Sequence, residues 1–415
     1  MKIEEIPLAV WGALSSVGEK PLELLPQREI KAGASMTSRE RVLSAISHRR
    51  VDRVPLMLCL EPHTTLKIAR SVKSPEKLSS QLLFEICWRL SKGLPTEELQ
   101  SAAPLPLYLI QSDYLLDLGA DIVDLIFSHP LLWYRGFYIK RGEMRFKDMY
   151  GITRGMKGLY LETVDFPCKT KDDLESYRFP DISFPLNYTH IKQYRRKHPE
   201  VALVVSCMGV QDWGQNFHPL EKLYLGMIKY PRVVKKFFKR MTEHTLQGIK
   251  GALRAGADLI MIGDDYGTQD SMFISKEMWE EFTYPCLKKQ IEAIHDWGGK
   301  ALLHSDGYIM PLLPKFVEAK LDALHPFQPV EKNNLKEAKE LYGDKLTFFT
   351  GIDVQKIGRM SRGEVRKDIV KTYKVASRRG GMVLSTTNML QVDTPVGNLK
   401  EMFATIRDIK QGKYG

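Results

Sequence analysis

Eight short apolar runs alternate with longer amphipathic stretches along this chain, and this alternation restricts the possible folds more than any other feature. Several runs are apolar almost throughout, as in "VALVVSC" (201–207), which is typical of parallel strands covered on both faces. The runs that we interpret as strands are residues 53–61, 119–127, 201–207, 257–263, 299–305, 321–327, 345–351 and 381–387. No glycine-rich phosphate loop follows any of them, so an open doubly wound sheet is disfavoured. The pattern predicts an α/β fold, the (β/α)8 TIM barrel.

The domain organisation follows from the segments around these runs. Residues 1–35 are loosely patterned and are interpreted as an N-terminal extension, with the barrel domain over 36–415. Thr37 and Glu40 have the spacing of a capping box, so a helix is expected to begin there. Residues 134–165 alternate polar and aromatic side chains around glycines, which predicts a β-hairpin insertion after strand two that forms a flap over one barrel mouth. Further helices are predicted over residues 74–94, 275–299 and 394–410.

Composition excludes several classes of protein. The 415 residues are 43% hydrophobic, enough for a large core. The net charge of +11 comes from Lys and Arg interspersed with acids, and the basic runs "SHRR" and "QYRRKH" are short, so a nucleic-acid partner is not expected. Five scattered cysteines without a CxxC pair predict reduced thiols and a cytoplasmic protein. No signal peptide and no stretch of roughly 20 apolar residues is present, so no membrane association is expected.

Polar residues gather where the predicted strands end, which is where (β/α)8 barrels form their active sites. The fifth strand ends on His304, and Asp306 follows two positions later. Side chains at i and i+2 of a strand share a face, so this pair is expected in the barrel mouth. Asp264 and Asp265 follow the fourth strand, where either function or helix capping is open for them. Polar residues on or after other strands are Glu61, His63, Asp121, Gln211, His325 and Asn388, with His325 interpreted as structural.

Three kinds of chemistry fit such a mouth. A divalent metal on His304 with one or two carboxylates is possible, since imidazole and carboxylate suit zinc or manganese. Paired carboxylates with separated pKa values could perform acid–base catalysis, and a polar substrate could be recognised without a metal. The sequence has neither HExxH nor CxxC, so the residues alone leave all three open.

Five stretches, taken as a set, resemble the uroporphyrinogen decarboxylase (URO-D) superfamily. They are "RERVLSAISHRRVDRVPL" (39–56), residues 263–307, "LDALHPFQP" (321–329), "TGID" (350–353) and "VDTPVGNLKEM" (392–402). The resemblance extends over about residues 37–410 and implies a (β/α)8 barrel. The superfamily contains true decarboxylases, which need no cofactor, and zinc methyltransferases that exchange a methyl group with a corrinoid carrier.

The match to the decarboxylase branch is incomplete. That branch has an arginine-rich "RQAGR" after strand one, where this chain has "LCLEPHTTLK" (58–67). Glu61 would repel the polycarboxylate porphyrinogen, so with His63 it is expected to contact a different substrate. Asp121, in "GADIVD", is similar in position to the decarboxylase aspartate that binds the pyrrole NH groups, and it is the catalytic residue of that alternative.

The methyltransferase branch carries His-x-Cys after strand five and a further Cys after strand eight. This chain has His304-Ser305-Asp306 and Asn388 at those places. Oxygen in place of sulfur suits a methyl donor bound through oxygen or nitrogen rather than a thiolate. The resemblance therefore favours a corrinoid-linked methyltransferase acting on a small methoxylated or methylamine-like substrate.

In that interpretation the roles divide as follows. His304 and Asp306 would hold zinc, Asp264 and Asp265 would act as ligand or acid, and Asn388 with Gln211 would bind the substrate. The corrinoid would come from a partner protein, and a homo-oligomer is compatible with the chain. Two alternatives remain open, a uroporphyrinogen decarboxylase of tetrapyrrole biosynthesis and a non-enzymatic partner protein.

Overall fold

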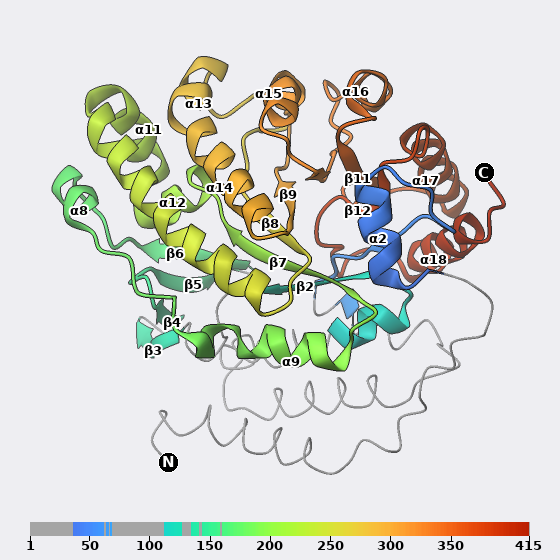
Figure 1. The fold of residues 1–415 in the computed structure, drawn as a ribbon, viewed down its shortest axis with the longest axis horizontal. Coiled ribbons are helices and arrows are strands. Elements are labelled where there is room, and N and C mark those ends of the chain that lie inside the picture. Colours follow the sequence, from blue (N-terminus) through green and yellow to red (C-terminus); the bar gives the residue numbers. More distant parts are fainter. Residues whose placement is uncertain are drawn as a thin grey trace, which may run out of the picture. The chain divides into compact units, whose positions relative to one another are not determined.

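Eight parallel strands form one sheet that curls into a nearly closed barrel (Figure 1). The computed structural model describes residues 36–61, 64–65, 67–68, 112–126, 134–140, 143–157 and 160–414. The strands are β1 (Leu56–Met57), β2 (Ile122–Ile126), β7 (Ala202–Met208), β8 (Leu259–Gly263), β9 (Lys300–His304), β10 (Ala323–His325), β11 (Thr347–Ile352) and β12 (Met382–Thr386). Their order is β1-β12-β11-β10-β9-β8-β7-β2. Each strand lies within one of the eight predicted runs or overlaps it, and six of the eight end within one residue of the predicted C-terminal end, so the predicted barrel is confirmed. The exceptions are β1, which ends four residues early, and β10, which ends two residues early.

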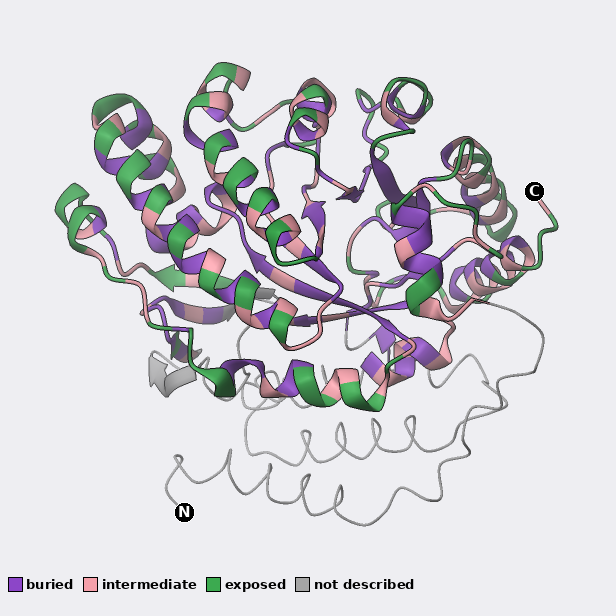
Figure 2. Cartoon of the chain, in the orientation of Figure 1, coloured by how far each residue is buried: buried purple, intermediate pink, exposed green. Residues whose placement is uncertain are grey.

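Helices cover the outside of the sheet and one end of the barrel. They are α2 (Ser38–Ile46), α8 (Lys171–Ser176), α9 (Thr189–Lys197), α10 (Gln211–Phe217), α11 (Leu220–Lys229), α12 (Pro231–Arg254), α13 (Lys276–Phe282), α14 (Tyr284–Asp296), α15 (Leu313–Glu318), α16 (Leu335–Tyr342), α17 (Arg362–Ala376) and α18 (Val396–Lys410), with 3-10 turns η2 (Pro185–Tyr188) and η3 (Met310–Leu312). The strands are buried almost throughout, and the outer helices bury one side and expose the other (Figure 2). This burial on both faces of the sheet explains why the strand sequences are continuous apolar runs.

The barrel interior has its own apolar cluster, made by alternate strand residues that point inward. Val42 and Ile46 of α2 join it, so this helix closes the end of the barrel where the strands begin. The inward strand residues of the cluster are Met57, Ile122, Ala202, Val204, Leu259, Leu302, Ala323, Phe349 and Val383. The opposite end, where the strands finish, is left to polar side chains.

Three of the predicted helical segments can be compared directly with the structure, and the one predicted over 394–410 is α18. Thr37 and Glu40 form the predicted capping box at the start of α2. The segment 275–299, predicted as one helix, is divided into α13 and α14. Pro285 lies in the first turn of α14, and a proline inside a continuous helix would lack its hydrogen bond and crowd the preceding turn. The helix predicted over 74–94 and the extension 1–35 lie outside the described residues.

The insertion after strand two is a four-stranded antiparallel sheet. Its strands are β3 (Tyr134–Lys140), β4 (Glu143–Asp148), β5 (Thr153–Lys157) and β6 (Tyr160–Asp165), as the alternation over 134–165 predicted. Two hydrogen bonds connect it to helices of the barrel: Thr163 Oγ1 donates to Asn216 Oδ1 at 2.7 Å, and Tyr150 OH lies 3.1 Å from His244 Nε2. The role as a flap stays a prediction.

Asp121 closes the barrel between β1 and β2. The Asp121 N–H donates to the Leu56 carbonyl at 2.8 Å, and the Leu56 N–H donates back to Asp121 Oδ2 at 3.0 Å. The fully buried carboxylate also pairs with Arg41 at 2.7 Å and Arg53 at 2.8 Å, and these pairs lower its pKa against the effect of burial. Because Asp121 precedes β2, it lies at the end where the strands begin, and the structure does not place this predicted catalytic residue near His304.

Replacement of this aspartate should destabilise the fold strongly. Asp121→Ala leaves Arg41, whose side chain is only 4% exposed, without one of its buried partners. Breaking a buried ion pair from one side typically costs about 3–5 kcal/mol, measurable as a lower free energy of unfolding in denaturant titrations. The exposed pair of Asp165 and Lys169 offers a control, because Asp165→Ala should cost at most about 1 kcal/mol. Equal, small losses for both variants would contradict the assignment.

The described residues were also compared with the expectations on membranes and cysteines. In the part of the chain that the structure describes, none of the helices combines the length and the apolar character that crossing a bilayer requires. The described cysteines, Cys59, Cys168, Cys207 and Cys286, are all free thiols.

Candidate functional site

Three predicted side chains meet where β8 and β9 end. His304 Nε2 lies 3.9 Å from Asp265 Oδ1 and 4.0 Å from Asp306 Oδ2. The three potential ligand atoms all lie within 4.8 Å of one another. These gaps are too long for hydrogen bonds and match an arrangement in which a cation lies between the groups. We call His304, Asp265 and Asp306 the triad.

The local sequence dictates this convergence. Leu302 belongs to the barrel interior, so alternation along β9 turns His304 inward two residues later. The chain then turns at Gly307, whose φ is +78° and where a Cβ would lie 2.3 Å from the Gly267 carbonyl oxygen. Only glycine fits such a close approach in a left-handed conformation. This turn brings Asp306 back beside the mouth.

Hydrogen bonds hold the loop that carries Asp306. The Asp306 N–H donates to Asp265 Oδ1 at 2.9 Å, which joins two members of the triad directly. The Gly307 N–H donates to Gln328 Oε1 at 2.7 Å, and Asn333 Nδ2 donates to the Gly307 carbonyl at 2.8 Å. The buried amides of Gln328 and Asn333, in the segment after β10, therefore fix the loop.

Asn388 contacts the triad from the end of β12. Its Nδ2 donates to Asp306 Oδ2 at 2.5 Å, so this predicted substrate-binding residue orients a carboxylate. Burial raises the pKa of Asp306 to about 6, and the neighbouring Asp265 adds to the rise, while His304 and Asn388 oppose it. The other carboxylate oxygen, Oδ1, is buried without a hydrogen-bond partner.

His325 lies against His304 at the end of the neighbouring strand. The two Nδ1 atoms are 2.8 Å apart, and His325 Nε2 lies 3.2 Å from the Thr386 carbonyl oxygen. Burial lowers the pKa of His325 to about 3, and nearby His304 lowers it further. The sequence alone favours a structural role for His325. Strand register adds the missing signal, since His304 and His325 are directly paired residues of adjacent strands.

Two acids outside the predicted site belong to the same region. Asp124, on β2, accepts from Ser206 Oγ at 2.8 Å, and burial raises its pKa to about 7 despite that bond and the opposing effect of His304. Asp212, at the start of α10, has a pKa raised to about 6 by burial and by Asp265. Both acids are visible in the sequence at strand ends without an assigned role, and the inward alternation that starts at Ile122 is the signal that favours Asp124.

Asp264 faces away from the triad. Its carboxylate accepts from the Asp212 N–H at 2.6 Å and the Val210 N–H at 3.2 Å, at the start of α10. Burial raises its pKa to about 8. The four predicted acid–imidazole residues therefore do not converge as one group, because Asp265 and Asp306 join His304 while Asp264 does not. Asp264 caps α10, which lies earlier in the chain, and not the following helix that the sequence had left open to it.

Gly209 provides a test of this capping role. A Cβ at Gly209 would lie 2.2 Å from the Cβ and Cγ atoms of Asp264. Gly209→Ala should therefore push the Asp264 carboxylate off its backbone donors and lower the free energy of unfolding by about 1–3 kcal/mol. At Gly358 nothing lies within 4 Å of the place that a Cβ would take, so Gly358→Ala should change stability by less than about 0.5 kcal/mol. A neutral Gly209→Ala in denaturant titrations would refute the packing argument.

The remaining predicted substrate-binding residues have other surroundings. Gln211 is fully buried, where its Oε1 accepts from Thr283 Oγ1 at 3.1 Å and its Nε2 contacts the Asp265 carbonyl at 3.4 Å. Glu61 is buried, and its carboxylate accepts from the Thr64 N–H at 3.1 Å. His63 lies outside the described residues. Gln211 thus supports the triad from behind and has no surface for a substrate.

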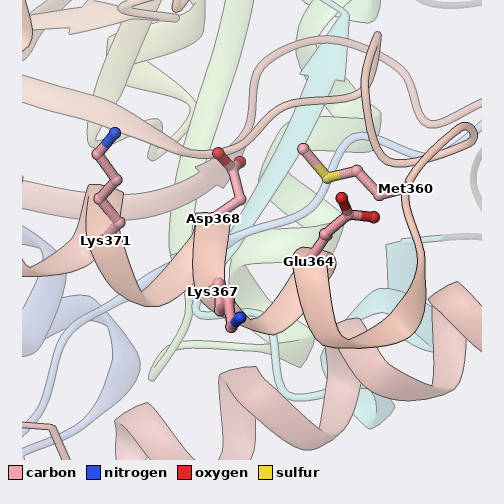
Figure 3. A pocket seen from close by; sticks show the side chains of 5 residues that line it. All are labelled: Met360, Glu364, Lys367, Asp368 and Lys371. Carbon is pink, nitrogen blue, oxygen red and sulfur yellow. The ribbon is translucent and has the colours of Figure 1, made fainter.

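A separate pocket lies on the outer helix α17. It is lined by Met360, Glu364, Lys367, Asp368 and Lys371 (Figure 3). Asp368 and Lys371 point to the same side of the helix, and Met360 comes from the segment before it. The mixed charges of this pocket neutralise one another, and none of its residues belongs to the strand ends.

The fold and the polar strand ends define a barrel of the kind that carries active sites at its C-terminal face. The family model of uroporphyrinogen decarboxylase (URO-D) matches residues 161–409, more than half of the chain, so the chain belongs to the URO-D family. This confirms the resemblance seen in the sequence.

Solved structures with the same fold are distant in sequence. A methyltransferase from Methanosarcina mazei has a TM-score of 0.60 at 17% identity, with 92% of this chain and 100% of that chain covered. A B12-independent methionine synthase from a Shewanella species has a TM-score of 0.44 at 13% identity, with 76% and 90% covered. The first likeness supports the fold, and the second is too weak to add to it. No curated protein sequence matches the chain.

Proposed function

We propose that this URO-D family member is a metal-dependent methyltransferase. It takes a methyl group from a small methoxylated or methylamine-like compound and passes it to a corrinoid carried by a partner protein. The observation that carries the proposal is the triad, one imidazole nitrogen and two carboxylates spaced for a cation at the barrel mouth. The methyltransferase from Methanosarcina mazei with the same fold is compatible with this proposal.

The donor set of the triad fits zinc. Imidazole nitrogen and carboxylate oxygen are both zinc ligands, with bonds of about 2.0–2.2 Å, so two ligand atoms on one ion lie roughly 3.3 Å apart. The observed gaps of 3.9 and 4.0 Å would have to shorten by roughly 0.6 Å for both carboxylates to share one ion with His304. The buried, unpartnered Oδ1 of Asp306 is a further sign of a missing cationic partner.

Each residue of the site has a distinct role in such a reaction. A bound zinc ion would act as a Lewis acid on the oxygen or nitrogen of the methyl donor. The methyl group would move to the reduced corrinoid, which supplies the electron pair of the new bond, and the departing oxygen or nitrogen would take up a proton. Asp212, buried beside Asp265 with its pKa raised to about 6, would deliver that proton from the fraction of the carboxyl that is protonated near neutral pH. Asn388 keeps Asp306 aligned.

The decarboxylase alternative receives less support. A porphyrinogen with several carboxylates would meet Asp124, Asp212, Asp265 and Asp306 at this mouth, and like charges disfavour such binding. Asp121, central to that alternative, is engaged with arginines at the other end of the barrel. The scaffold alternative does not account for carboxylates and an imidazole arranged around a cation-sized gap.

A direct experiment separates the three functions. The purified protein is loaded with Zn²⁺, Mn²⁺ or Co²⁺, dialysed and analysed for metal, then mixed with cob(I)alamin and a panel of methoxylated aromatics and methylamines. We expect one metal per chain and a donor-dependent spectral change of the corrinoid as it is methylated. Loss of carboxylates from uroporphyrinogen would revive the decarboxylase. Absence of metal binding and of both reactions would favour a non-enzymatic role.

A further inference from the structure

A chain of hydrogen bonds below the triad assigns the protons of both histidines. The Thr386 carbonyl oxygen can only accept, so the contact with His325 Nε2 at 3.2 Å requires a proton on that nitrogen. A neutral imidazole carries one N–H, which leaves His325 Nδ1 with a lone pair. The Nδ1 atoms of the two rings are 2.8 Å apart. His304 must therefore donate from its Nδ1, and in the neutral form of the ring, the form that can bind a cation, its Nε2 is left unprotonated.

The surroundings of His325 keep its ring neutral and fixed. Its side chain is 1% exposed. The His304 ring lies beside it, with ring centroids 5.0 Å apart and an interplanar angle of 31°, and the Phe349 ring is T-shaped to it at 6.1 Å. The Thr386 carbonyl also accepts from Ser385 Oγ at 2.8 Å, which anchors the acceptor itself. A buried ring with an imidazole and a phenyl as neighbours has little to stabilise a second proton.

We propose that His325 is a positioning residue that sets the tautomer of His304, so that the Nε2 lone pair faces Asp265 and Asp306 before any cation binds. The tautomer of His304 is a property of the protein without metal. Only the use of the Nε2 lone pair as a metal ligand rests on the proposed function. Ligating histidines need their other N–H held by an acceptor, and here the acceptor is a second histidine one strand away. The arrangement also leaves His304 without a proton to donate from Nε2, so the proton for the leaving group has to come from another residue.

We call the hydrogen-bonded chain from the Thr386 carbonyl through His325 to His304 Nδ1 the relay. A residue that only filled the space of His325 would not maintain this chain. A phenyl ring would occupy the same volume but offers no acceptor to His304 Nδ1. An asparagine can place its side-chain oxygen near the Nδ1 position and accept the same bond. His325→Phe should therefore release the tautomer of His304, and His325→Asn should retain it. His244, another buried histidine, which bonds to Tyr150 OH from α12, offers a matched control.

The test uses nitrogen shifts of histidine and metal affinity. Protein with ¹⁵N-labelled histidine is studied without metal, and the His304 signals are assigned by their loss in His304→Gln. We expect a pyrrole-type Nδ1 and a pyridine-type Nε2 in the wild type and in His325→Asn. In His325→Phe we expect a mixed or reversed pattern, with Zn²⁺ or Co²⁺ affinity lower by about 10–100-fold. His244→Phe should change neither measurement.

Two outcomes would contradict the inference that His325 sets the tautomer of His304. A neutral His304 with its proton on Nε2 in the wild type, measured at a pH where the ring has lost its charge, would overturn the relay, as would a His325→Phe protein with unchanged shifts and unchanged affinity. Failure of the proposed function has a different signature: the shifts would show the expected tautomer while no methyl donor reacts. Thermal unfolding of each variant separates loss of fold from loss of the relay.

Discussion

His304→Ala should abolish stoichiometric metal binding and, with it, methyl transfer. His304 is the only imidazole in the triad, and its Nε2 is the atom from which the 3.9 and 4.0 Å gaps to the carboxylates are measured. Loss of an outer hydrogen-bond partner already lowers metal affinity by about 10–100-fold, so loss of the ligand itself should exceed about 100-fold. Competition titrations with Zn²⁺, or the visible spectrum of the Co²⁺ form, measure the change.

A second histidine serves as the control for this prediction. His295 is partly exposed on α14 and bonds to Asp322 Oδ2 at 2.7 Å, at the end of the barrel where β9 and β10 begin. His295→Ala removes the same kind of side chain away from the mouth and should leave the metal stoichiometry unchanged. A His304→Ala protein that keeps both its fold and wild-type affinity would show that the metal, if bound, lies elsewhere.

The fold was predictable because its signals are local. Each parallel strand is buried on both faces, so its identity survives as a continuous apolar run in the sequence. The capping box of Thr37 and Glu40 likewise depends on residues three positions apart. The break between α13 and α14 was missed, although Pro285 was visible, because the amphipathic pattern continues across it.

The site was only partly predictable because it depends on strand register. His304 and Asp306 could be paired from their spacing, since they share one strand end. The partnership of His304 with His325 requires that β9 and β10 be neighbours in register, as they are, and no local pattern contains that information. The opposite roles of Asp264 and Asp265 show the same limit. Adjacent residues at a strand end point to different sides, and only the position of α10 decides which one becomes the cap.

The depth of Asp121 in the barrel could not be predicted from its loose positional likeness to a catalytic aspartate. It lies in an apolar strand segment, like a catalytic aspartate, yet it precedes the first residue of β2. Over the length of a short strand, at about 3.3 Å per residue, this separates it from the mouth by more than about 10 Å. Asp124, three residues later and within β2, lies close enough for His304 to influence its pKa.

Asp212→Asn should lower the rate of methyl transfer by about 10²–10⁴-fold while the metal stays bound. In the proposed mechanism this residue supplies the proton of the leaving group, and general acids contribute rates of that order. An asparagine keeps the size of the side chain and the backbone N–H that donates to Asp264, so the start of α10 should be preserved. Single-turnover methylation of cob(I)alamin, together with metal analysis, separates the chemical step from loss of the ion.

The loss of rate in Asp212→Asn should depend on the leaving group of the methyl donor. A donor whose leaving group is already a weak base, such as a methoxy group on an electron-poor ring, needs the proton least, so Asp212→Asn should affect it less than an alkyl methyl ether. Asp172→Asn, at an exposed position in the first turn of α8, should leave both rates unchanged. If Asp212→Asn slows all donors equally, or loses its metal, the carboxylate serves to hold the ion or the substrate, and the proton comes from elsewhere.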